Sequence, residues 1–201
     1  IGASGDTITI PSGATFTNSG TTSAITISGA LTVDGGTIKL DGNYPTGTDN
    51  VAMGDTALDS VEAGGTHNTA IGSKSGTAIT TGDCNTSVGS CSLSANTTGV
   101  KNVAIGRIAL RDNTSGDGNV AVGTLSMLAN TTGDNNVAIG LCALVTNSTA
   151  SDNIGVGNNA LAVNTTGSQN VAVGSLALDA NTIGCRGVAI GYNAMGANTD
   201  G

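Results

Sequence analysis

The sequence predicts an all-β fold in which residues 50–201 form a parallel β-roll or β-solenoid and residues 1–49 form a small N-terminal β module. Three observations support this prediction: a repeated unit of 17 residues, short apolar runs inside each unit, and Gly and Asn at fixed places in the unit. A fixed period of this kind is the signature of proteins built from stacked units. The chain therefore divides into two parts, and only residues 50–201 follow the 17-residue repeat.

The first part, residues 1–49, contains four short runs of alternating β-branched and apolar residues, separated by Gly, Ser and Asp. Such runs are typical of strands joined by tight turns. Their connections are too short for helical crossovers, so we predict a β-rich collar or shaft module with a junction over residues 43–49. The runs are Thr7–Ile10, Ala24–Ile27, Leu31–Val33 and Thr37–Leu40.

The second part, residues 50–201, consists of nine copies of one unit, whose clearest form starts at Asn102 as NVAIGRIAL. Successive starts lie 18 residues apart once and 17 residues apart seven times. Position 1 of the unit is Asn in eight copies, and position 5 is Gly in all nine. We expect each copy to form one coil of the stack. The copies start at residues 50, 68, 85, 102, 119, 136, 153, 170 and 187.

Positions 2–4 of the unit, such as Val103-Ala104-Ile105, are expected to form a strand whose successive side chains point to opposite faces. We predict that the face with Val and Ile is buried in the rod and that the Ala face packs closely against a neighbour. Gly106, at position 5, is expected to form a corner that needs a positive φ or a close backbone approach. A second strand is predicted at about positions 8–11, followed by a wide turn over positions 12–17.

The polar positions of the unit also have a structural interpretation. Asn at position 1 is expected to stack from coil to coil and to share amide hydrogen bonds. The Asn-Thr-Thr-Gly run at positions 12–15 is typical of a turn, in which Asn tolerates the left-handed region and Gly closes the turn. The small side chains at positions 3 and 8 favour a close neighbour, and a lone rod of this kind is thin. We therefore predict a homotrimer, either intertwined or side by side.

The composition excludes several classes of function. A formal charge of −8 argues against sequence-independent nucleic-acid binding, which needs clustered Lys and Arg. No apolar run approaches the length of a transmembrane helix, so membrane insertion is not expected. No secretion signal is visible, and the start at Ile1 and the stop inside a repeat suggest a piece of a longer protein.

No catalytic constellation, cofactor site or metal site is predicted, and the chain is not expected to be an enzyme. The lone His67 lies in the 18-residue spacing and is interpreted as the inserted residue of a bulged turn. The cysteines lack metal-binding spacing and are expected to be free thiols, although two of them could approach across a turn. These are Cys84 and Cys91, and the others are Cys142 and Cys185.

Two further groups of residues have a functional and a structural interpretation. Acidic residues in the turns would bind Ca²⁺ if they converged, but a solvated acidic edge is the favoured interpretation. Several Asn residues at position 12 begin N-x-S/T triplets, which makes glycosylation a minor hypothesis because the turn already explains them. The acidic residues are Asp112, Asp117, Asp134, Asp152 and Asp179. The triplets begin at Asn96, Asn113, Asn130, Asn147 and Asn164.

The unit NVAIGxxALxxNTTGxxN resembles the repeats of the head domain of trimeric autotransporter adhesins, which carry a shorter SVAIG-type unit in a left-handed β-roll. It is more similar to 17-residue repeats of bacteriophage tail fibre and tail spike proteins. Residues 5–15 resemble a segment common in tail fibres of marine and cyanobacterial phages. The resemblance covers nearly the whole chain, and it implies a homotrimeric fibre on a virion or a cell surface.

The function that this resemblance implies is a structural segment of a trimeric phage tail fibre that extends or presents a host-attachment tip. The alternatives are the head or stalk of a trimeric bacterial surface adhesin, a polysaccharide-degrading tail spike and an ice-binding protein. Expected partners are further copies of the chain, other tail or fibre proteins and, through regions outside this chain, a host surface glycan or protein. The expected location is the virion, or alternatively the extracellular space or the bacterial cell surface.

Overall fold

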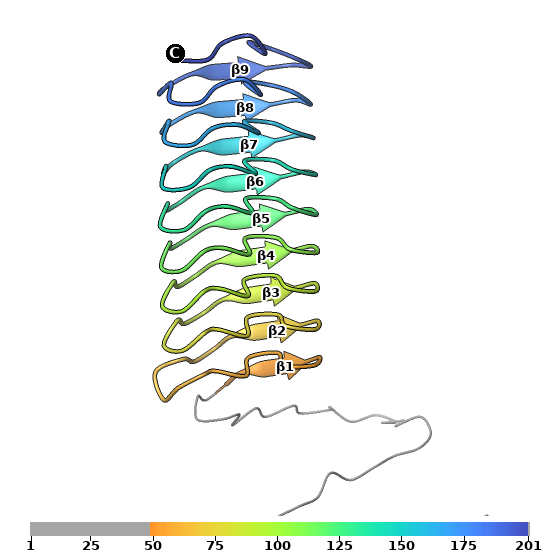
Figure 1. Cartoon of the computed structure of the whole chain (residues 1–201), viewed down its shortest axis with the longest axis vertical. Coiled ribbons are helices and arrows are strands. Elements are labelled where there is room, and N and C mark those ends of the chain that lie inside the picture. Colours follow the sequence, from red (N-terminus) through yellow and green to blue (C-terminus); the bar gives the residue numbers. More distant parts are fainter. Residues whose placement is uncertain (1–48, 201) are drawn as a thin grey trace, which may run out of the picture. The chain divides into compact units, whose positions relative to one another are not determined.

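The computed structural model describes residues 49–200, which form a stack of coils that carries one parallel β-sheet (Figure 1). Each coil contributes one three-residue strand, and the nine strands lie in chain order. The prediction of an all-β parallel β-solenoid is confirmed, whereas the predicted module over residues 1–49 lies outside the described residues except for Asp49. The strands are β1 (Val51–Met53), β2 (Thr69–Ile71), β3 (Thr86–Val88), β4 (Val103–Ile105), β5 (Val120–Val122), β6 (Val137–Ile139), β7 (Ile154–Val156), β8 (Val171–Val173) and β9 (Val188–Ile190).

The register of the sheet places each repeat position of every coil in one column. We number the coils 1 to 9, from the copy that starts at residue 50. Val103 of β4 pairs with Val120 of β5, and the remaining pairings keep this spacing except that β1 and β2 are one residue further apart. Backbone hydrogen bonds also join the coils outside the strands, as when Leu110 N donates to Ser126 O at 2.9 Å. The repeat period is therefore the length of one coil.

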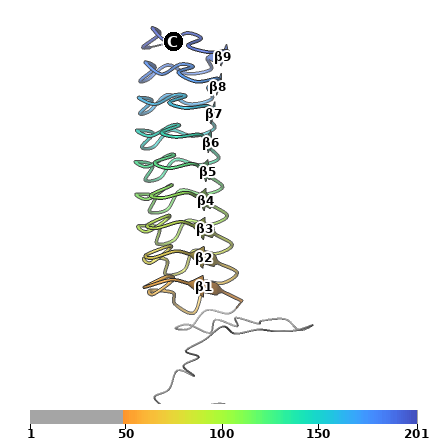
Figure 2. The same cartoon turned by 90° about the vertical axis from the view of Figure 1, so that its right-hand side faces the viewer.

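Positions 8–11 do not form the second strand that the sequence predicts. They lie in turns, because positions 7 and 9 of each coil adopt the left-handed region, with φ 62° for Ile108 and φ 50° for Leu110. A residue in this region interrupts the extended backbone and reverses the chain locally. The result is a one-sided coil, and Figure 2 shows the strands along one side of the stack and the turns along the other.

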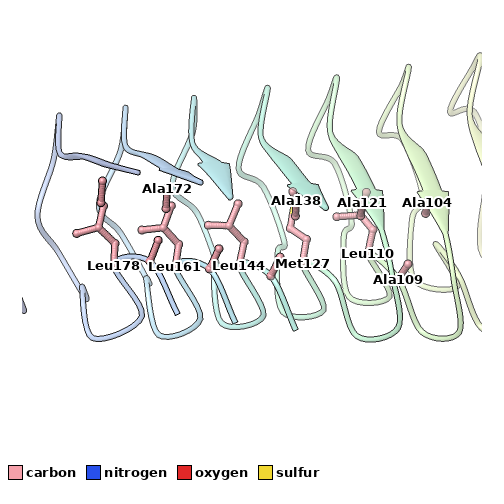
Figure 3. Close-up of a cluster of buried hydrophobic side chains, with 14 of the residues drawn as sticks. Ala104, Ala109, Leu110, Ala121, Met127, Ala138, Leu144, Leu161, Ala172 and Leu178 are labelled. Carbon is pink, nitrogen blue, oxygen red and sulfur yellow. The ribbon is translucent and has the colours of Figure 1, made fainter. Parts of the chain in front are cut away.

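The interior of the stack is lined by positions 3 and 9, which reverses the predicted orientation of the strands. Ala104 and Leu110 are 0% exposed, whereas Ile105 is 41% exposed. The long side chains at position 9 fill the narrow interior and point towards the strand, as Leu144 and Leu161 do in Figure 3. The strand can lie this close because position 3 is small. Val and Ile at positions 2 and 4 therefore point outward, and the prediction that they are buried is wrong.

Gly at position 5 forms the predicted corner. Gly106 has φ +134°, and a Cβ atom built there would lie 2.6 Å from both the carbonyl carbon and the carbonyl oxygen of Gly123 in the next coil. Real Cβ atoms essentially never come within 3.0 Å of such atoms. Position 5 thus needs glycine both for its backbone conformation and for the close spacing of the coils.

Two columns of buried Asn join the coils, one at position 1 and one at position 12. In the first, the backbone N–H of Asn119 donates to Asn102 Oδ1 at 2.9 Å, which confirms the predicted ladder. In the second, Asn130 Nδ2 donates to Asn113 Oδ1 at 2.8 Å. Both columns also donate to the carbonyl at position 15, since Gly133 O accepts from Asn119 Nδ2 at 2.8 Å and from Asn130 Nδ2 at 3.0 Å.

The turn over positions 12–17 is therefore built differently from the sequence interpretation. Asn113 is buried and is not left-handed, and the positive φ falls instead at position 17, as in Asn135 with φ 56°. Gly116, at position 15, does not have a positive φ either. It is needed for space, because a Cβ there would lie 2.5 Å from Gly133 O and from Asn113 Oδ1. Hydrogen bonding between coils explains Asn at position 12.

The extra residue of coil 1 lies before His67. Asn50 Nδ2 donates to Gly65 O at 2.9 Å, which is the contact that position 1 makes with position 15 in later coils. His67 then occupies position 17 with φ 57°, as Cys84 does in the next coil with φ 59°. The extra residue thus falls within the exposed turn 62–64. The interpretation of His67 as the inserted residue is wrong.

Candidate functional site

The side chains that could carry acid–base or metal chemistry remain dispersed. Within residues 49–200, no group of three or more His, Cys, Asp and Glu residues is placed to hold a metal ion. His67 Nε2 lies 3.6 Å from Asp49 Oδ2, and His67 Nδ1 lies 2.9 Å from Thr66 Oγ1. The side chains of His67 and Asp49 are 62% and 66% exposed, so water screens the pair. The expectation that the chain is not an enzyme stays a prediction.

The acidic turn residues named by the sequence do not converge on one point. Asp134 Oδ1 accepts a hydrogen bond from the backbone N–H of Asp117 at 2.8 Å, between neighbouring coils. Asp112 instead accepts from Arg111 Nε at 2.6 Å, and this hydrogen bond raises the pKa of the Arg111 guanidinium. The Asp134 carboxylate thus accepts from the preceding coil, and the Asp112 carboxylate accepts from the adjacent residue of its own coil. The other two acidic residues, in coils 6 and 8, are Asp152 and Asp179.

The four cysteines are free thiols, and Cys84 and Cys91 do not form a disulfide. Cys91 and Cys142 share position 7 but lie three coils apart, whereas Cys84 and Cys185 are exposed on the turns at positions 17 and 16.

The asparagines of the N-x-S/T triplets are buried inside the turn. Asn113 is 0% exposed, and its Nδ2 donates to Asn96 Oδ1 at 2.7 Å and to Gly116 O at 3.0 Å. Attachment of an oligosaccharide requires this nitrogen to be accessible. In the folded coil both N–H groups of Asn113 are used, so the structure favours the turn interpretation of these triplets over glycosylation.

The turn side of the stack carries a column of threonines at position 13. Thr97 Oγ1 donates to Thr114 O at 3.0 Å, and Thr114 Oγ1 donates to Thr131 O at 3.0 Å. These hydroxyl groups therefore hold one coil to the next. The neighbouring position 14 is exposed, as at Thr98 and Thr132. This side of the stack is polar and is hydrated through position 14.

The opposite side of the stack carries a continuous apolar surface, which we call the outer stripe. It consists of positions 2 and 4 of coils 1–9, the first and last residues of strands β1 to β9. Sixteen of its eighteen residues are Val, Ile or Met, and the exceptions are Thr69 and Thr86. Ile105 and Ile139 are 41% and 40% exposed. Contiguous apolar surface of this kind marks an interaction site more often than a bare surface.

The outer stripe extends over the whole described stack. At ~4.8 Å between neighbouring strands, nine strands give it a length of roughly 40 Å. In coils 4 to 6, the adjoining corner at position 7 adds the half-buried side chains of Ile108, Leu125 and Cys142. The outer stripe is therefore a long, narrow aliphatic surface that runs along the axis of the stack.

Reasoning from the sequence placed these Val and Ile residues inside the rod and so missed the surface. The side-chain volumes within the repeat do indicate which residues face the interior. Position 9 is Leu or Met in eight of nine coils, and position 3 is always Ala, Ser or Gly. A narrow interior packs well when large residues face small ones, so these two columns belong together.

No protein-family model, curated protein or solved structure matches this chain. In the part of the chain that the structure describes, no helix has the length and apolar character needed to span a membrane. The candidate function therefore depends on the coil architecture and on the outer stripe.

Proposed function

We propose that residues 50–200 form a structural segment of a trimeric phage tail fibre, in which three copies pack in parallel through their outer stripes. The observation that supports this proposal is the stripe itself, because it repeats at every coil and is apolar at sixteen of eighteen positions. In a parallel arrangement in register, each coil faces the same coil of the other copies. The apolar contact between the outer stripes of the copies then extends over the full height of the stack.

The stripe is large enough for stable association. Covering a Val or Ile side chain that is about 40% exposed, as Ile105 is, contributes roughly 1 kcal/mol. Eight of the sixteen apolar side chains are at least 36% exposed, and covering these eight contributes roughly 8 kcal/mol per copy. The loss of translational and rotational freedom costs about 4–15 kcal/mol, and covering the other eight, partly exposed side chains adds to the gain that offsets this cost. The number of copies, three, follows from the resemblance of the repeat to trimeric fibres.

A structural role is supported by how the regular positions are used. Gly106 allows close stacking, the Asn columns join the coils, and Thr114 donates its hydroxyl group to the next coil. The side chains at these positions stabilise the stacking of the coils. The use of the position-13 hydroxyls within the stack also counts against an ice-binding face. The segment would extend or present a host-attachment tip, with other tail or fibre proteins and a host surface glycan or protein as partners of the complete fibre.

A trimeric adhesin of a bacterial surface would use the same architecture. The two are distinguished by the regions that flank the repeats in the full-length gene product. A membrane-anchor region at the C-terminus indicates an adhesin on a cell surface, and a baseplate-attachment region indicates a fibre on a virion.

The assembly is tested by sedimentation equilibrium of the wild type and of the double variant Ile105→Asp/Ile139→Asp, which places carboxylates in the stripe. The matched control is Ser115→Asp/Thr149→Asp, which changes exposed residues on the turn side of the same two coils. We expect trimers for the wild type and the control, and monomers for the stripe variant. A folded wild-type monomer, or an unchanged trimer in the stripe variant, would contradict the proposal.

A further inference from the structure

The buried apolar side chains of the stack form two separate clusters. The lower cluster contains side chains of coils 1 and 2, including Leu58, Val61 and Ile79. The upper cluster starts at Leu93 in coil 3 and continues to Ala189 in coil 9. The apolar core is therefore interrupted once within the described stack, between coils 2 and 3. We call this level the polar seam.

Three buried serines occupy the core at the polar seam. Ser75 Oγ donates to Ser87 Oγ at 2.7 Å and lies 3.1 Å from Ser92 Oγ. All three stand where most other coils have Ala, at positions 3 and 8. Gly76 is next to Ser75 and is the single residue at position 9 that is neither Leu nor Met. The seam thus replaces aliphatic contact by a small network of hydroxyl groups.

The position-12 column is interrupted at the same level, whereas the position-1 column continues, with the backbone N–H of Asn85 donating to Asn68 Oδ1 at 2.9 Å. In coils 4 to 8, the Asn at position 12 donates Nδ2 to the Asn of the preceding coil, as Asn113 does to Asn96 at 2.7 Å. Below Asn96 the residue at position 12 is Ile79, so this hydrogen bond is absent at the seam. The outer stripe also loses apolar character here, since its two threonines are Thr69 and Thr86.

The backbone ladder, in contrast, continues across the seam. Gly76 N donates to Ser92 O at 2.9 Å, and Gly89 N donates to Ile71 O at 2.7 Å. A hydrogen bond contributes little net stability, because the separated groups bond to water instead. Burial of a Leu side chain contributes more stability than one such hydrogen bond. The seam therefore keeps the register of the coils while giving less stabilisation than the other interfaces.

We propose that coils 1 and 2, residues 50–84, form a cap that unfolds and refolds as one unit while coils 3 to 9 stay folded. In a stack where each coil contacts only its neighbours, stability is a sum of coil and interface contributions, and opening occurs at the weakest interface. Coil 1 holds to coil 2 through the lower cluster, which Leu58 and Ile79 share. The opening depends on one chain only and does not require the trimer.

The test is native-state hydrogen exchange of the full chain, resolved by coil. Amides that bridge coils 1 and 2, such as Val51 N and Gly72 N, are expected to exchange together and at least tenfold faster than those of coils 4 to 7. The step in protection is expected between coils 2 and 3. At the other end of the stack, fraying from coil 9 is expected to give a gradual change. Coil 2 amides protected as strongly as those of coil 4 would overturn the proposal.

A repaired seam provides the second arm of the test. The variant Ser75→Ala/Gly76→Leu/Ile79→Asn/Ser87→Ala/Ser92→Ala gives coils 2 and 3 the residues that most later coils have at these positions. The backbone suits Leu at position 9, since Gly76 has φ 57° and Leu93 has φ 49° at the same place. A Cβ at Gly76 would lie 2.9 Å from Ile79 Cδ1, which the variant removes, and 3.1 Å from Leu58 Cδ2, which is the end of a flexible side chain.

In the repaired variant the step is expected to disappear and the coil 2 amides to slow by at least tenfold. The control is Ser126→Ala, a buried serine inside the upper cluster, which is expected to leave the step in place. A step that survives the repair would contradict the role of the seam. If the repaired chain does not fold, the wild-type profile alone still decides whether the cap opens as a unit.

Discussion

The corner glycine of coil 4 offers a sharp test of how closely the coils stack. In Gly106→Val, the new Cβ would lie 2.6 Å from the carbonyl carbon and oxygen of Gly123, and the backbone would have to keep φ at +134°. Holding a β-branched residue in so sparsely populated a region costs about 1–3 kcal/mol. Overpacking against neighbouring backbone costs about 1–3 kcal/mol more. We therefore expect the free energy of unfolding to fall by about 4 kcal/mol.

The assay is thermal unfolding followed by far-ultraviolet circular dichroism. For a chain of this size, 1 kcal/mol shifts Tm by about 2–4 °C, so the expected fall is roughly 8–16 °C. The matched control is Arg107→Ala, because Arg107 is the next residue and is exposed. It is expected to change Tm by less than about 2 °C. Equal melting temperatures for the two variants would refute the corner role of position 5.

Two further substitutions test the polar contacts of the stack. Asn113→Ala removes two donated hydrogen bonds and one accepted hydrogen bond in the position-12 column, so it is expected to lower the free energy of unfolding in urea by about 3 kcal/mol. Thr132→Ala, at an exposed position 14, is the control, and an equal loss there would contradict the importance of the buried column. Asp179→Ala removes a carboxylate whose Oδ1 is buried without a hydrogen-bond partner, so stability is expected to rise by about 1 kcal/mol. A lower urea midpoint for this variant would show that the carboxylate is stabilising.

The stacking of the chain could be predicted because period and structure coincide. Neighbouring strands are displaced by the repeat length, so every column of the stack is a column of the aligned repeat. Gly106 and Asn102 could be interpreted correctly for the same reason. A residue that recurs in all or nearly all copies meets its own equivalent above and below, and both close backbone approach and amide sharing require such equivalence.

The inner face of each strand could not be predicted from alternation alone. Val103, Ala104 and Ile105 are all apolar, so the strand has no polar face to mark the solvent side. The decisive quantity is the volume available inside the coil, which Leu110 fills. The turns at positions 7 and 9 could not be predicted from the sequence either, since Ile and Leu, as at Ile108 and Leu110, rarely adopt the left-handed region. Their conformation is imposed by contacts with the adjacent coils.

The role of Asn113 was misassigned for a related reason. Asn-Thr-Thr-Gly has the composition of an exposed turn, and composition does not distinguish an exposed Asn from a buried one. The distinction depends on whether Asn96 and Asn130 lie within hydrogen-bonding distance, which only the stacked arrangement reveals.

The central claim, that copies associate in parallel through the outer stripe, is tested most directly by cross-linking. Single cysteines are placed at Val122 in the stripe and at Thr132 on the turn side of the same coil, in a background where the four native cysteines are replaced by Ser. A short bis-maleimide then joins cysteines that lie close together in neighbouring copies. We predict covalent dimers of the 19.3 kDa chain for Val122→Cys and none for Thr132→Cys. Cross-linking through Thr132→Cys but not through Val122→Cys would contradict the account.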